Sequence, residues 1–510
     1  MYNKLWLESG LVENSEKEII MNMNKTSSAF DGLIKFGTAG MRGIMEPGSN
    51  RINRFTVAQV SRALSQYMKN NNQSRIVIAC DTRNNSELFK SISATIFLSY
   101  GLEVFVFEKV VPVPILSYAV TKLHCDFGVY ITASHNSKEY NGYKVFDKTG
   151  CQIIEQVAEE ISNLRAELEL IQEIPNINNN FNIVGDDIIN CFLKRVSGYQ
   201  KQLSRNIDIT YTGLFGTGNN LIDKFLSEQG YSVHTVESQS AYNGNFPELS
   251  GPNPENEEAF EEALKVADKY KSDIIIATDP DADRLGVMVY HKGEYIKLSG
   301  NQVGVLLTDY MIKNNTKANV CVIKSDVSSK MAEKICSKKK IPMINVPTGF
   351  KYIGAKINEN KYDFLFGFEE SCGYLIGDYI RDKDSVGASL MICEMTEKYK
   401  NKGKTLIDRL NKLYKKYGYF LENTLSFPLT KEVNLLELTE IFKDHHILFN
   451  NFRYSDGALE INTYDKTSLI FRKSGTEPKM KVYIRVYNDK KEKAEELLKF
   501  YTEVVSQLKI

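Results

Sequence analysis

Apolar runs and helical patterns alternate along most of the chain. Runs such as RIVIAC and DIIIAT have the length and the β-branched residues of buried strands. Segments such as EEAFEEALKVADKYK stand between them, with apolar residues at helical spacing. The rhythm appears in three blocks, near residues 75–136, 230–284 and 318–371. Strand–helix–strand alternation is typical of mostly parallel sheets covered by helices, so the pattern predicts three α/β domains of related build.

The C-terminal part of the chain follows a different pattern. Residues 467–488 predict two strands around a loop, and residues 491–510 predict an amphipathic terminal helix. This α+β pattern predicts a smaller fourth domain, and the polar stretch 172–187 is the best candidate for the first linker. The expected domains are 1–190 for domain I, 191–299 for domain II, 300–415 for domain III and 416–510 for domain IV.

Length and composition restrict the class of protein. At 510 residues the chain is too long for a single hydrophobic core. Its 64 basic and 64 acidic residues create no global field that would hold nucleic acid or an anionic membrane. The eight cysteines stand singly, without a C-x-x-C pair, which disfavours a zinc site and indicates a reducing compartment. The sequence shows no signal-peptide core and no run of membrane-spanning length. We therefore expect a cytoplasmic protein without a nucleic-acid or membrane partner.

A serine stands directly behind the strand-like run FGVYIT. Ser134 is followed by His135, then by an Asn-Gly turn and Lys144. Ligand groups collect at the carboxyl ends of strands in open α/β sheets, so a serine at this place is a candidate for group-transfer chemistry. Taken alone, the stretch is compatible with several activities.

Three carboxylates follow the apolar run SDIIIAT at alternating positions. Asp279, Asp281 and Asp283 can converge on one hard divalent cation, and Mg²⁺ favours oxygen ligands of this kind. An EF-hand loop also begins with alternating acids, but Arg284 stands where that loop needs glycine and Tyr290 where it needs glutamate. A solvated acidic turn is the other alternative, and the repulsion of three close carboxylates disfavours it. The segment therefore predicts a magnesium site.

Three further loops carry groups that suit a phosphorylated sugar. GFEESCGY, residues 367–374, offers acceptors for sugar hydroxyls, although a capped turn explains it equally well. FRKSGTEPK, residues 471–479, combines basic side chains with hydroxyls and main-chain N–H groups, as a phosphate cradle does, and an ordinary basic β-turn is its alternative. KFGTAGMRG, residues 35–43, allows close approach of a ligand and carries Arg42, but it has neither of the glycine spacings that bind nucleotides.

Together these motifs fit phosphoryl transfer on a sugar, and their order makes a resemblance specific. FGTAGMRG, TASHNSKEYNGYKVF, DPDADRLG, PTGFKYIG, GFEESCGY, RDKD and SGTEPK follow one another from about residue 36 to near the C-terminus. The chain resembles the α-D-phosphohexomutase superfamily of phosphoglucomutases and phosphomannomutases, in the branch that also includes phosphopentomutases. The resemblance implies three related α/β domains with mostly parallel sheets and a smaller C-terminal α+β domain, with the active site in the central cleft.

The resemblance also implies a role for each matching residue. The catalytic positions fall on Ser134, His135, Lys144 and Arg42. The metal ligands fall on Ser134, Asp279, Asp281 and Asp283. The substrate-binding positions fall on Arg284, Thr348, Gly349, Glu369, Ser371, Arg472, Ser474, Gly475 and Thr476, of which the last four grip the distal phosphate. Ser134 would carry the transferred phosphate, and His135 and Lys144 would transfer protons.

The implied reaction interconverts a sugar 1-phosphate and a sugar 6-phosphate. A phosphoserine gives its phosphoryl group to the sugar, and the bisphosphorylated intermediate returns its other phosphate. The implied cofactors are Mg²⁺ and glucose 1,6-bisphosphate, and the partner is a small phosphosugar. Glucose phosphate is expected before mannose, pentose or hexosamine phosphate. Departures at Val111, Phe215, Lys473 and Ser385, where relatives usually have threonine, histidine, proline and glycine, leave this preference open.

Three other classes of protein are compatible with parts of the pattern. A metal-dependent phosphatase would use the aspartates but would need neither Ser134 nor a separate phosphate cradle. A serine hydrolase would need a G-x-S-x-G turn, which TASHN is not, and His135 should point away from Ser134 in an extended segment. A non-catalytic relative would act as a binding protein. Phosphate on Ser134 of the purified protein distinguishes a mutase from all three.

Overall fold

The computed structural model describes residues 2–24, 26–38, 40–177, 180–201, 204–429, 433–438, 447–455, 457–473 and 479–508. The chain forms two compact units. The first unit contains Met1–Lys297, Phe350–Lys361 and Gly373–Lys398, and the second contains Leu298–Gly349, Tyr362–Cys372 and Tyr399–Ile510.

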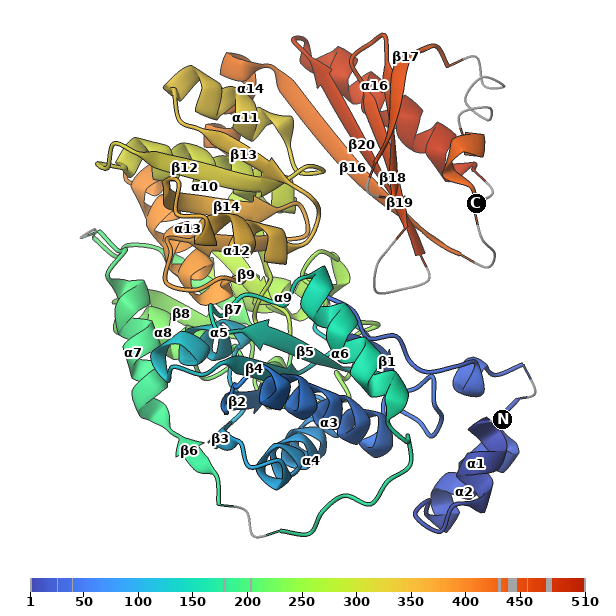
Figure 1. The fold of residues 1–510 in the computed structure, drawn as a ribbon. Coiled ribbons are helices and arrows are strands. Elements are labelled where there is room, and N and C mark those ends of the chain that lie inside the picture. The colour runs from blue at the N-terminus through green and yellow to red at the C-terminus, as the bar shows by residue number, and fades with distance from the viewer. Residues whose placement is uncertain are drawn as a thin grey trace. The chain divides into compact units, whose positions relative to one another are not determined.

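The first sheet of the first unit has six strands in the order β1-β5-β4-β2-β3-β6 (Figure 1). These strands are β1 (Met41–Ile44), β2 (Arg75–Cys80), β3 (Glu103–Phe107), β4 (Phe127–Ile131), β5 (Tyr140–Asp147) and β6 (Asn182–Val184). β2 pairs in parallel with β3 and β4, β3 pairs in parallel with β6, and β5 pairs antiparallel with β4 and β1. The parallel centre has continuous apolar runs because helices cover both of its faces.

Two groups of helices cover this sheet (Figure 1). They are α3 (Arg54–Asn70), α4 (Ser86–Ser99) and α6 (Glu155–Glu167) in one group, and α5 (Val113–Lys122) and α7 (Asp186–Ser197) in the other. α3 begins where the Asn53 side chain accepts hydrogen bonds from the N–H groups of Phe55 and Thr56. The short helices α1 (Tyr2–Glu8) and α2 (Asn14–Asn22) precede the sheet, and the buried Trp6 packs edge-on against Phe55.

The second sheet of the first unit has the order β11-β10-β9-β7-β8. Its elements are β7 (Asp208–Thr212), α8 (Ile222–Glu228), β8 (Ser232–Thr235), α9 (Glu261–Tyr270), β9 (Ile274–Thr278), β10 (Leu285–His291) and β11 (Glu294–Leu298). β9 is parallel to β7 and antiparallel to β10. Every residue of β9 is buried, so the turn that follows it, with the three aspartates, begins inside the protein. The first unit also holds α12 (Phe350–Asn358), β15 (Gly373–Ile376) and most of α13 (Ser385–Lys400).

The second unit begins with an α/β region. Its elements are α10 (Gly300–Asn314), β12 (Val320–Ser325), α11 (Lys330–Lys339), β13 (Met343–Val346), β14 (Asp363–Glu369) and α14 (Leu406–Tyr417). β12 pairs in parallel with both β13 and β14. Together with the first two sheets, this region confirms the prediction of three α/β regions with mostly parallel strands.

The C-terminal sheet of the second unit is antiparallel, with the order β16-β20-β19-β18-β17. Its elements are β16 (Tyr419–Pro428), β17 (Phe449–Ser455), β18 (Ala458–Thr463), β19 (Ser468–Lys473), β20 (Lys479–Asn488) and the helix α16 (Lys491–Ser506). Short 3₁₀ turns occur at Ser28–Phe30, Glu237–Gln239, Glu258–Phe260 and Leu435–Glu437. The two strands and the terminal helix predicted for this region are confirmed.

Three further observations bear on the sequence-based expectations. The predicted linker, residues 172–187, is not wholly a linker, because Asn182–Val184 forms β6 and pairs with β3 at the edge of the first sheet. The eight cysteines are free thiols. In the described part of the chain, no helix has both the length and the apolar character needed to cross a membrane.

Candidate active site

Ser134 lies in the loop that connects β4 to β5. It is 2% exposed, and its φ is +54°, a left-handed conformation that costs a residue with a side chain about 1–2 kcal/mol. Its main-chain N–H donates to Thr132 Oγ1 at 2.7 Å. Gly142 on β5 lies so close that a β-carbon there would be 2.3 Å from the Thr132 carbonyl oxygen. These contacts hold the serine loop in a turned conformation at the carboxyl end of β4.

Asp81 and Arg83, directly after β2, support the serine loop. Arg83 donates hydrogen bonds to the main-chain carbonyl oxygens of Ser134 (2.6 Å), Asn136, Ser137 (2.8 Å) and Tyr140 (3.0 Å). Asp81 Oδ2 accepts a hydrogen bond from Thr132 Oγ1 at 2.6 Å. Burial lowers the pKa of Arg83 to about 10, with Asp81 acting against this, so the guanidinium stays charged at neutral pH. Neither residue was singled out from the sequence, although both stand at the carboxyl end of a strand.

The three aspartates after β9 converge as the sequence predicted. One carboxylate oxygen from each of Asp279, Asp281 and Asp283 lies within 4.8 Å of the others, and all three residues are buried. Ser134 Oγ donates to Asp279 Oδ2 at 2.7 Å. Within the described residues, Oδ1 of Asp281 and Oδ1 of Asp283 have no hydrogen-bond donor. A buried set of carboxylate oxygens, two of which accept no hydrogen bond from the described part of the chain, fits a hard cation such as Mg²⁺.

Two buried lysines compensate part of this negative charge. Lys144 Nζ lies 2.7 Å from Asp281 Oδ2 and 3.2 Å from Asp283 Oδ2, and Lys383 Nζ lies 3.1 Å from Asp283 Oδ2. Burial acts to raise the pKa of Asp283, but the two lysines outweigh it and hold that pKa well below its usual value. Burial and the neighbouring carboxylates raise the pKa of Asp279 well above its usual value. Burial opposes the charge on Lys144, but Asp281 and Asp283 hold its pKa above the usual value.

Lys383 belongs to the RDKD motif but was given no role from the sequence. Its Nζ also donates to Asp382 Oδ1 at 3.0 Å. Gly373 leaves room for its side chain, because a β-carbon at Gly373 would lie 2.4 Å from Lys383 Cδ. Ser385, two residues later, donates its hydroxyl to the carbonyl oxygen of Ala282 in the aspartate turn. The glycine usual at this position could not make that hydrogen bond.

Main-chain groups from two other loops hold the aspartate turn. The N–H of Val113 donates to the Asp281 carbonyl oxygen at 2.9 Å, and the N–H of Thr217 donates to the Pro280 carbonyl oxygen at 2.8 Å. These two donors lie in the segments that contain the departures at Val111 and Phe215. Because the donors are main-chain groups, the departures leave the support of the turn intact.

Arg42 and Arg284 both lie in the first unit. Arg42 Nη1, on β1, donates to Asn136 Oδ1 in the serine loop at 2.8 Å. Arg284, directly after the last aspartate, forms an ion pair with Glu255, and its N–H donates to Asp279 Oδ1 at 2.9 Å. The structure therefore connects Arg42 to the serine loop and Arg284 to the aspartate turn.

His135 lies closer to Ser134 than expected. Its Nδ1 is 3.3 Å from Ser134 Oγ. The expectation that His135 points away from Ser134 is wrong, because it assumed an extended segment and the left-handed conformation of Ser134 breaks that segment. A serine hydrolase is still disfavoured, since Ser134 Oγ donates to a carboxylate of the aspartate cluster.

The predicted sugar-binding residues lie in the second unit. Glu369 Oε1 accepts a hydrogen bond from the N–H of Gly349 at 2.7 Å, so the end of β14 is joined to the loop after β13. Thr348 and Ser371 are half-buried on these same two segments. The structure thus brings together the loops that carry Thr348, Gly349 and Glu369.

The predicted phosphate loop is described in part. Arg472 is half-buried on β19 and lies opposite Lys481 of β20, and Lys473 lies opposite Met480. Ser474, Gly475 and Thr476 lie outside the described residues. The two strands that flank the loop are present as predicted.

Three family models match separate parts of the chain. They are the phosphoglucomutase/phosphomannomutase α/β/α domain I at residues 33–171, domain II at residues 188–293 and domain III at residues 299–417. A phosphomannomutase of Mycoplasmoides pirum is 32% identical over 522 residues, which cover 95% of each chain. A phosphoglucomutase of Staphylococcus saprophyticus is 32% identical over 534 residues, which cover 94% of this chain and 95% of the relative.

Solved structures share the fold over nearly the whole length. A phosphoglucomutase/phosphomannomutase family protein from Burkholderia thailandensis superposes with a TM-score of 0.72 over 92% of this chain and 96% of its own, at 16% identity. The matched domains, the relatives that are about one-third identical and the ordered motifs agree with one another. The chain belongs to the phosphoglucomutase/phosphomannomutase family of the α-D-phosphohexomutase superfamily, and it is a phosphosugar mutase.

Proposed function

We propose that this mutase interconverts glucose 1-phosphate and glucose 6-phosphate through a phosphoserine at Ser134 and a bisphosphorylated sugar. The observation that carries the proposal is the 2.7 Å hydrogen bond from Ser134 Oγ to Asp279 Oδ2, inside a buried cluster of three aspartates and two lysines. A serine that served only for packing would need no such surroundings. Burying this many charged groups costs stability, so their presence indicates a function.

The residues around Ser134 suit a transferring phosphoryl group. Asp279, Asp281, Asp283 and the phosphorylated Ser134 would hold Mg²⁺, which when bound supplies positive charge against the phosphoryl oxygens. Arg42 is anchored to the serine loop through Asn136, from where its guanidinium provides charge near that group. The three aspartates and Arg42 would bind and orient the group, and only Ser134 would exchange a bond with it.

The transfer itself exchanges one phosphorus–oxygen bond for another. The bond between phosphorus and Ser134 Oγ breaks, and a bond forms between phosphorus and a sugar hydroxyl oxygen, whose proton must leave. His135 Nδ1, 3.3 Å from Oγ, is placed to exchange a proton with the serine oxygen. We propose His135 and Lys144 as the two proton-transfer groups: one gives a proton to Ser134 Oγ as the bond to phosphorus breaks, and the other takes the proton of the sugar hydroxyl. When the bisphosphate presents its other phosphate to Ser134, the two proton transfers reverse.

We propose that a further set of residues binds the rest of the substrate. Arg284, Thr348, Gly349, Glu369 and Ser371 would contact the sugar. The distal phosphate would be gripped by Arg472, Ser474, Gly475 and Thr476. The domain boundaries proposed for this arrangement are 1–190, 191–299, 300–415 and 416–510. Glucose 1,6-bisphosphate would act as both intermediate and activator.

The preference for glucose is tested by a direct comparison of rates. Relatives of equal identity carry the names phosphoglucomutase and phosphomannomutase, so the family alone does not decide the sugar. We expect kcat/KM to be highest for glucose 1-phosphate when the 1-phosphates of glucose, mannose and ribose are assayed side by side with the matching bisphosphates. A higher value for mannose or ribose 1-phosphate would assign the enzyme to that sugar instead. Loss of activity with all three sugars in Ser134→Ala would support the shared phosphoserine step.

A further inference from the structure

We infer that Arg83, with Asp81 and Thr132, positions Ser134 for phosphoryl transfer without touching the reacting atoms. The inference rests on the proposed function of Ser134. Arg83 is 3% exposed, and its guanidinium reaches main-chain oxygens of the serine loop. These hydrogen bonds act on the reaction through the backbone of that loop.

The Arg83 guanidinium donates hydrogen bonds to four main-chain carbonyl oxygens within residues 134–140. Those four hydrogen bonds pull the loop into a closed turn around the Arg83 side chain. Ser134 sits at one end of this turn with a left-handed φ, a conformation that serine does not favour by itself. A lysine at position 83 would keep the charge but lose the planar fork that serves several acceptors at once.

Asp81 and Thr132 fix the main-chain N–H of the same serine. Thr132 Oγ1 donates a hydrogen bond to Asp81 Oδ2 at 2.6 Å, and it accepts one from the Ser134 N–H at 2.7 Å. Asp81 Oδ1 accepts two further hydrogen bonds, from the N–H of Arg83 at 2.9 Å and from Ser86 Oγ at 2.8 Å. The N–H and the carbonyl of Ser134 are thus both held by one buried network.

The first test compares Arg83→Lys with Arg165→Lys. Arg165 is a matched control, because it is equally buried and bonds the Ile34 carbonyl oxygen at 2.6 Å and Gln59 Oε1 at 2.9 Å. We expect Arg83→Lys to lower kcat and the rate of Ser134 phosphorylation by the bisphosphate about a hundredfold, with KM little changed. The two variants should lower the melting temperature by similar amounts, but Arg165→Lys should leave kcat within about twofold of the wild type. Equal effects of the two variants on kcat would overturn the inference.

A second pair of variants keeps the test valid if Arg83→Lys does not fold. Thr132→Val has nearly the same shape as the wild type but loses the hydroxyl that links Asp81 to the Ser134 N–H. Thr132→Ser keeps this hydroxyl. We expect Thr132→Val to lower kcat and Thr132→Ser to restore most of it. Equal activity of both would overturn the inference, whereas an active Ser134→Ala would overturn the proposed function itself.

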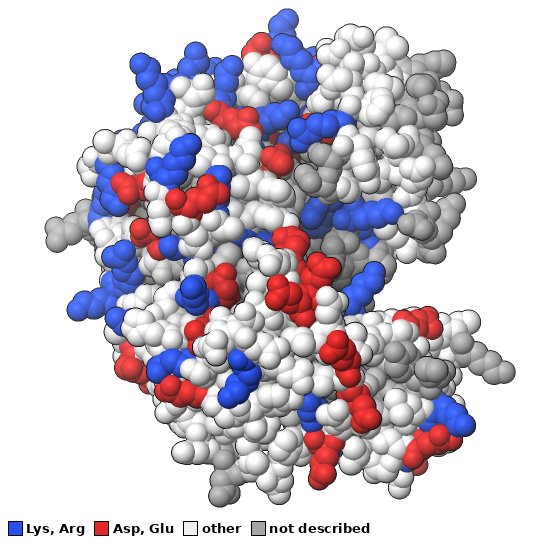
Figure 2. Space-filling view, in the orientation of Figure 1, with Lys and Arg blue, Asp and Glu red and all other residues white. Residues whose placement is uncertain are grey.

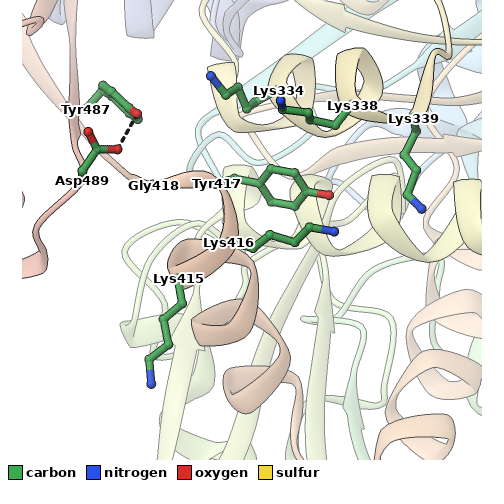
Figure 3. Close-up of a pocket in the computed structure, with 9 residues that line it drawn as sticks. All are labelled: Lys334, Lys338, Lys339, Lys415, Lys416, Tyr417, Gly418, Tyr487 and Asp489. Atoms are coloured by element: carbon green, nitrogen blue, oxygen red, sulfur yellow. Dashed lines mark hydrogen bonds between the residues drawn. The ribbon is translucent and has the colours of Figure 1, made fainter.

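A separate observation in the second unit points to a binding site for a small polyanion. A hollow of about 560 Å³ is lined by Lys334, Lys338 and Lys339 of α11, Lys415 and Lys416 of α14, and Tyr417, Gly418, Tyr487 and Asp489 (Figure 3). Figure 2 shows Lys and Arg side chains gathered at the top of the view, where α11 and α14 lie in Figure 1. We call this hollow the lysine pocket. We propose that it binds a small molecule with a chain of several phosphate groups.

The charges of the lysine pocket are balanced only in part by the protein. Among the described residues no acidic side chain forms an ion pair with any of its five lysines. The acid in the lining, Asp489, accepts a hydrogen bond from the Tyr487 hydroxyl at 2.7 Å. The five lysines bring five positive charges. Asp489 removes one, and the C-terminal ends of α11 and α14 remove about half a charge each, so roughly three positive charges remain. Helix ends alone therefore do not account for the cluster.

The position of Lys334 adds to this argument. It lies in the middle of α11, away from the helix end, and four residues before Lys338, so the two like charges repel each other. A bound anion would remove that repulsion. In Figure 3 the Lys415 side chain points away from the other lysines. Its charge would attract the anion without contacting it. The volume is within the usual range for small-molecule sites.

Calorimetric titration of the full-length enzyme with inorganic tripolyphosphate tests the proposal. We expect Lys338→Gln/Lys416→Gln to weaken binding about tenfold and to leave KM for the sugar phosphate unchanged. The control is Lys69→Gln/Lys122→Gln, two exposed lysines in the last turns of α3 and α5. An effect of similar size in both double variants, or in neither, would overturn the proposal. Titration with adenosine triphosphate in a second arm distinguishes a nucleotide from a bare phosphate chain.

Discussion

Replacing Lys383 with methionine removes one of the two ammonium groups that compensate the aspartate cluster. At 3.1 Å from Asp283 Oδ2, this ammonium attracts the carboxylate by about 5 kcal/mol at an effective dielectric constant near 20. Desolvation of the ammonium offsets part of that attraction, and breaking a buried ion pair from one side costs about 3–5 kcal/mol. Methionine keeps most of the aliphatic stem. We therefore expect Lys383→Met to lose about 3 kcal/mol of stability in metal-free buffer.

Magnesium should restore most of this loss. If the aspartates hold Mg²⁺, the cation brings two positive charges to the carboxylates that lost their ammonium partner. We expect the loss of stability in Lys383→Met to fall to about 1 kcal/mol at saturating Mg²⁺. Mg²⁺ should therefore raise the stability of the variant about 2 kcal/mol more than that of the wild type, which corresponds to several degrees in melting temperature.

Differential scanning calorimetry with and without Mg²⁺ measures this difference. Lys351→Met is the control, because Lys351 forms a 2.7 Å ion pair in the same unit with Glu155, whose side chain is 61% exposed. That variant should lose less than about 1 kcal/mol, independently of Mg²⁺. An equal loss for Lys383→Met in both buffers would refute the reasoning, since it would show that the lysine and the metal do not share the same carboxylates.

Three further predictions concern the metal site, the distal phosphate and a buried glutamate. Asp281→Asn should abolish turnover, as removal of divalent metal does, and only the wild type should recover on addition of Mg²⁺; turnover by either metal-free protein would contradict the metal site. Arg472→Ala should raise KM about ten- to a hundredfold while saturating bisphosphate still phosphorylates Ser134, and an unchanged KM would show that the loop is only a turn. Burial raises the pKa of Glu422 from 4.5 to about 7. Between pH 4.5 and about 7 the folded protein therefore keeps a proton on Glu422 that the unfolded protein has released. Stability should fall by about 3 kcal/mol as the pH rises from about 4.5 to 7, and urea unfolding of Glu422→Gln should lack this part of the pH dependence.

The features that lie within one short stretch of sequence could be predicted. The carboxylates of Asp279, Asp281 and Asp283 converge because all three belong to one segment of five residues, which keeps them close to one another. The parallel α/β regions followed from buried apolar runs that alternate with helical periodicity. The edge strand Asn182–Val184 was missed, because three residues at the border of a sheet give no periodic signal.

The features that depend on tertiary structure could not be predicted. Arg83 reaches the serine loop because β2 and β4 are neighbours in the sheet, and Lys383 reaches Asp283 across 100 positions of sequence. The proximity of His135 to Ser134 depends on a left-handed serine. A left-handed conformation cannot be recognised from the sequence when the residue is not glycine.

The central claim is that Ser134 carries the phosphate that moves between the two positions of the sugar. Its most direct test is mass spectrometry of the enzyme after labelling with isotopically marked bisphosphate, followed by a chase with unlabelled sugar 1-phosphate in a single turnover. The account predicts one labelled phosphate on Ser134 that is lost to the sugar at a rate no slower than kcat, and no label on Ser134→Ala. A wild-type enzyme that turns over with Ser134 unlabelled, or that keeps its label through many turnovers, would contradict it.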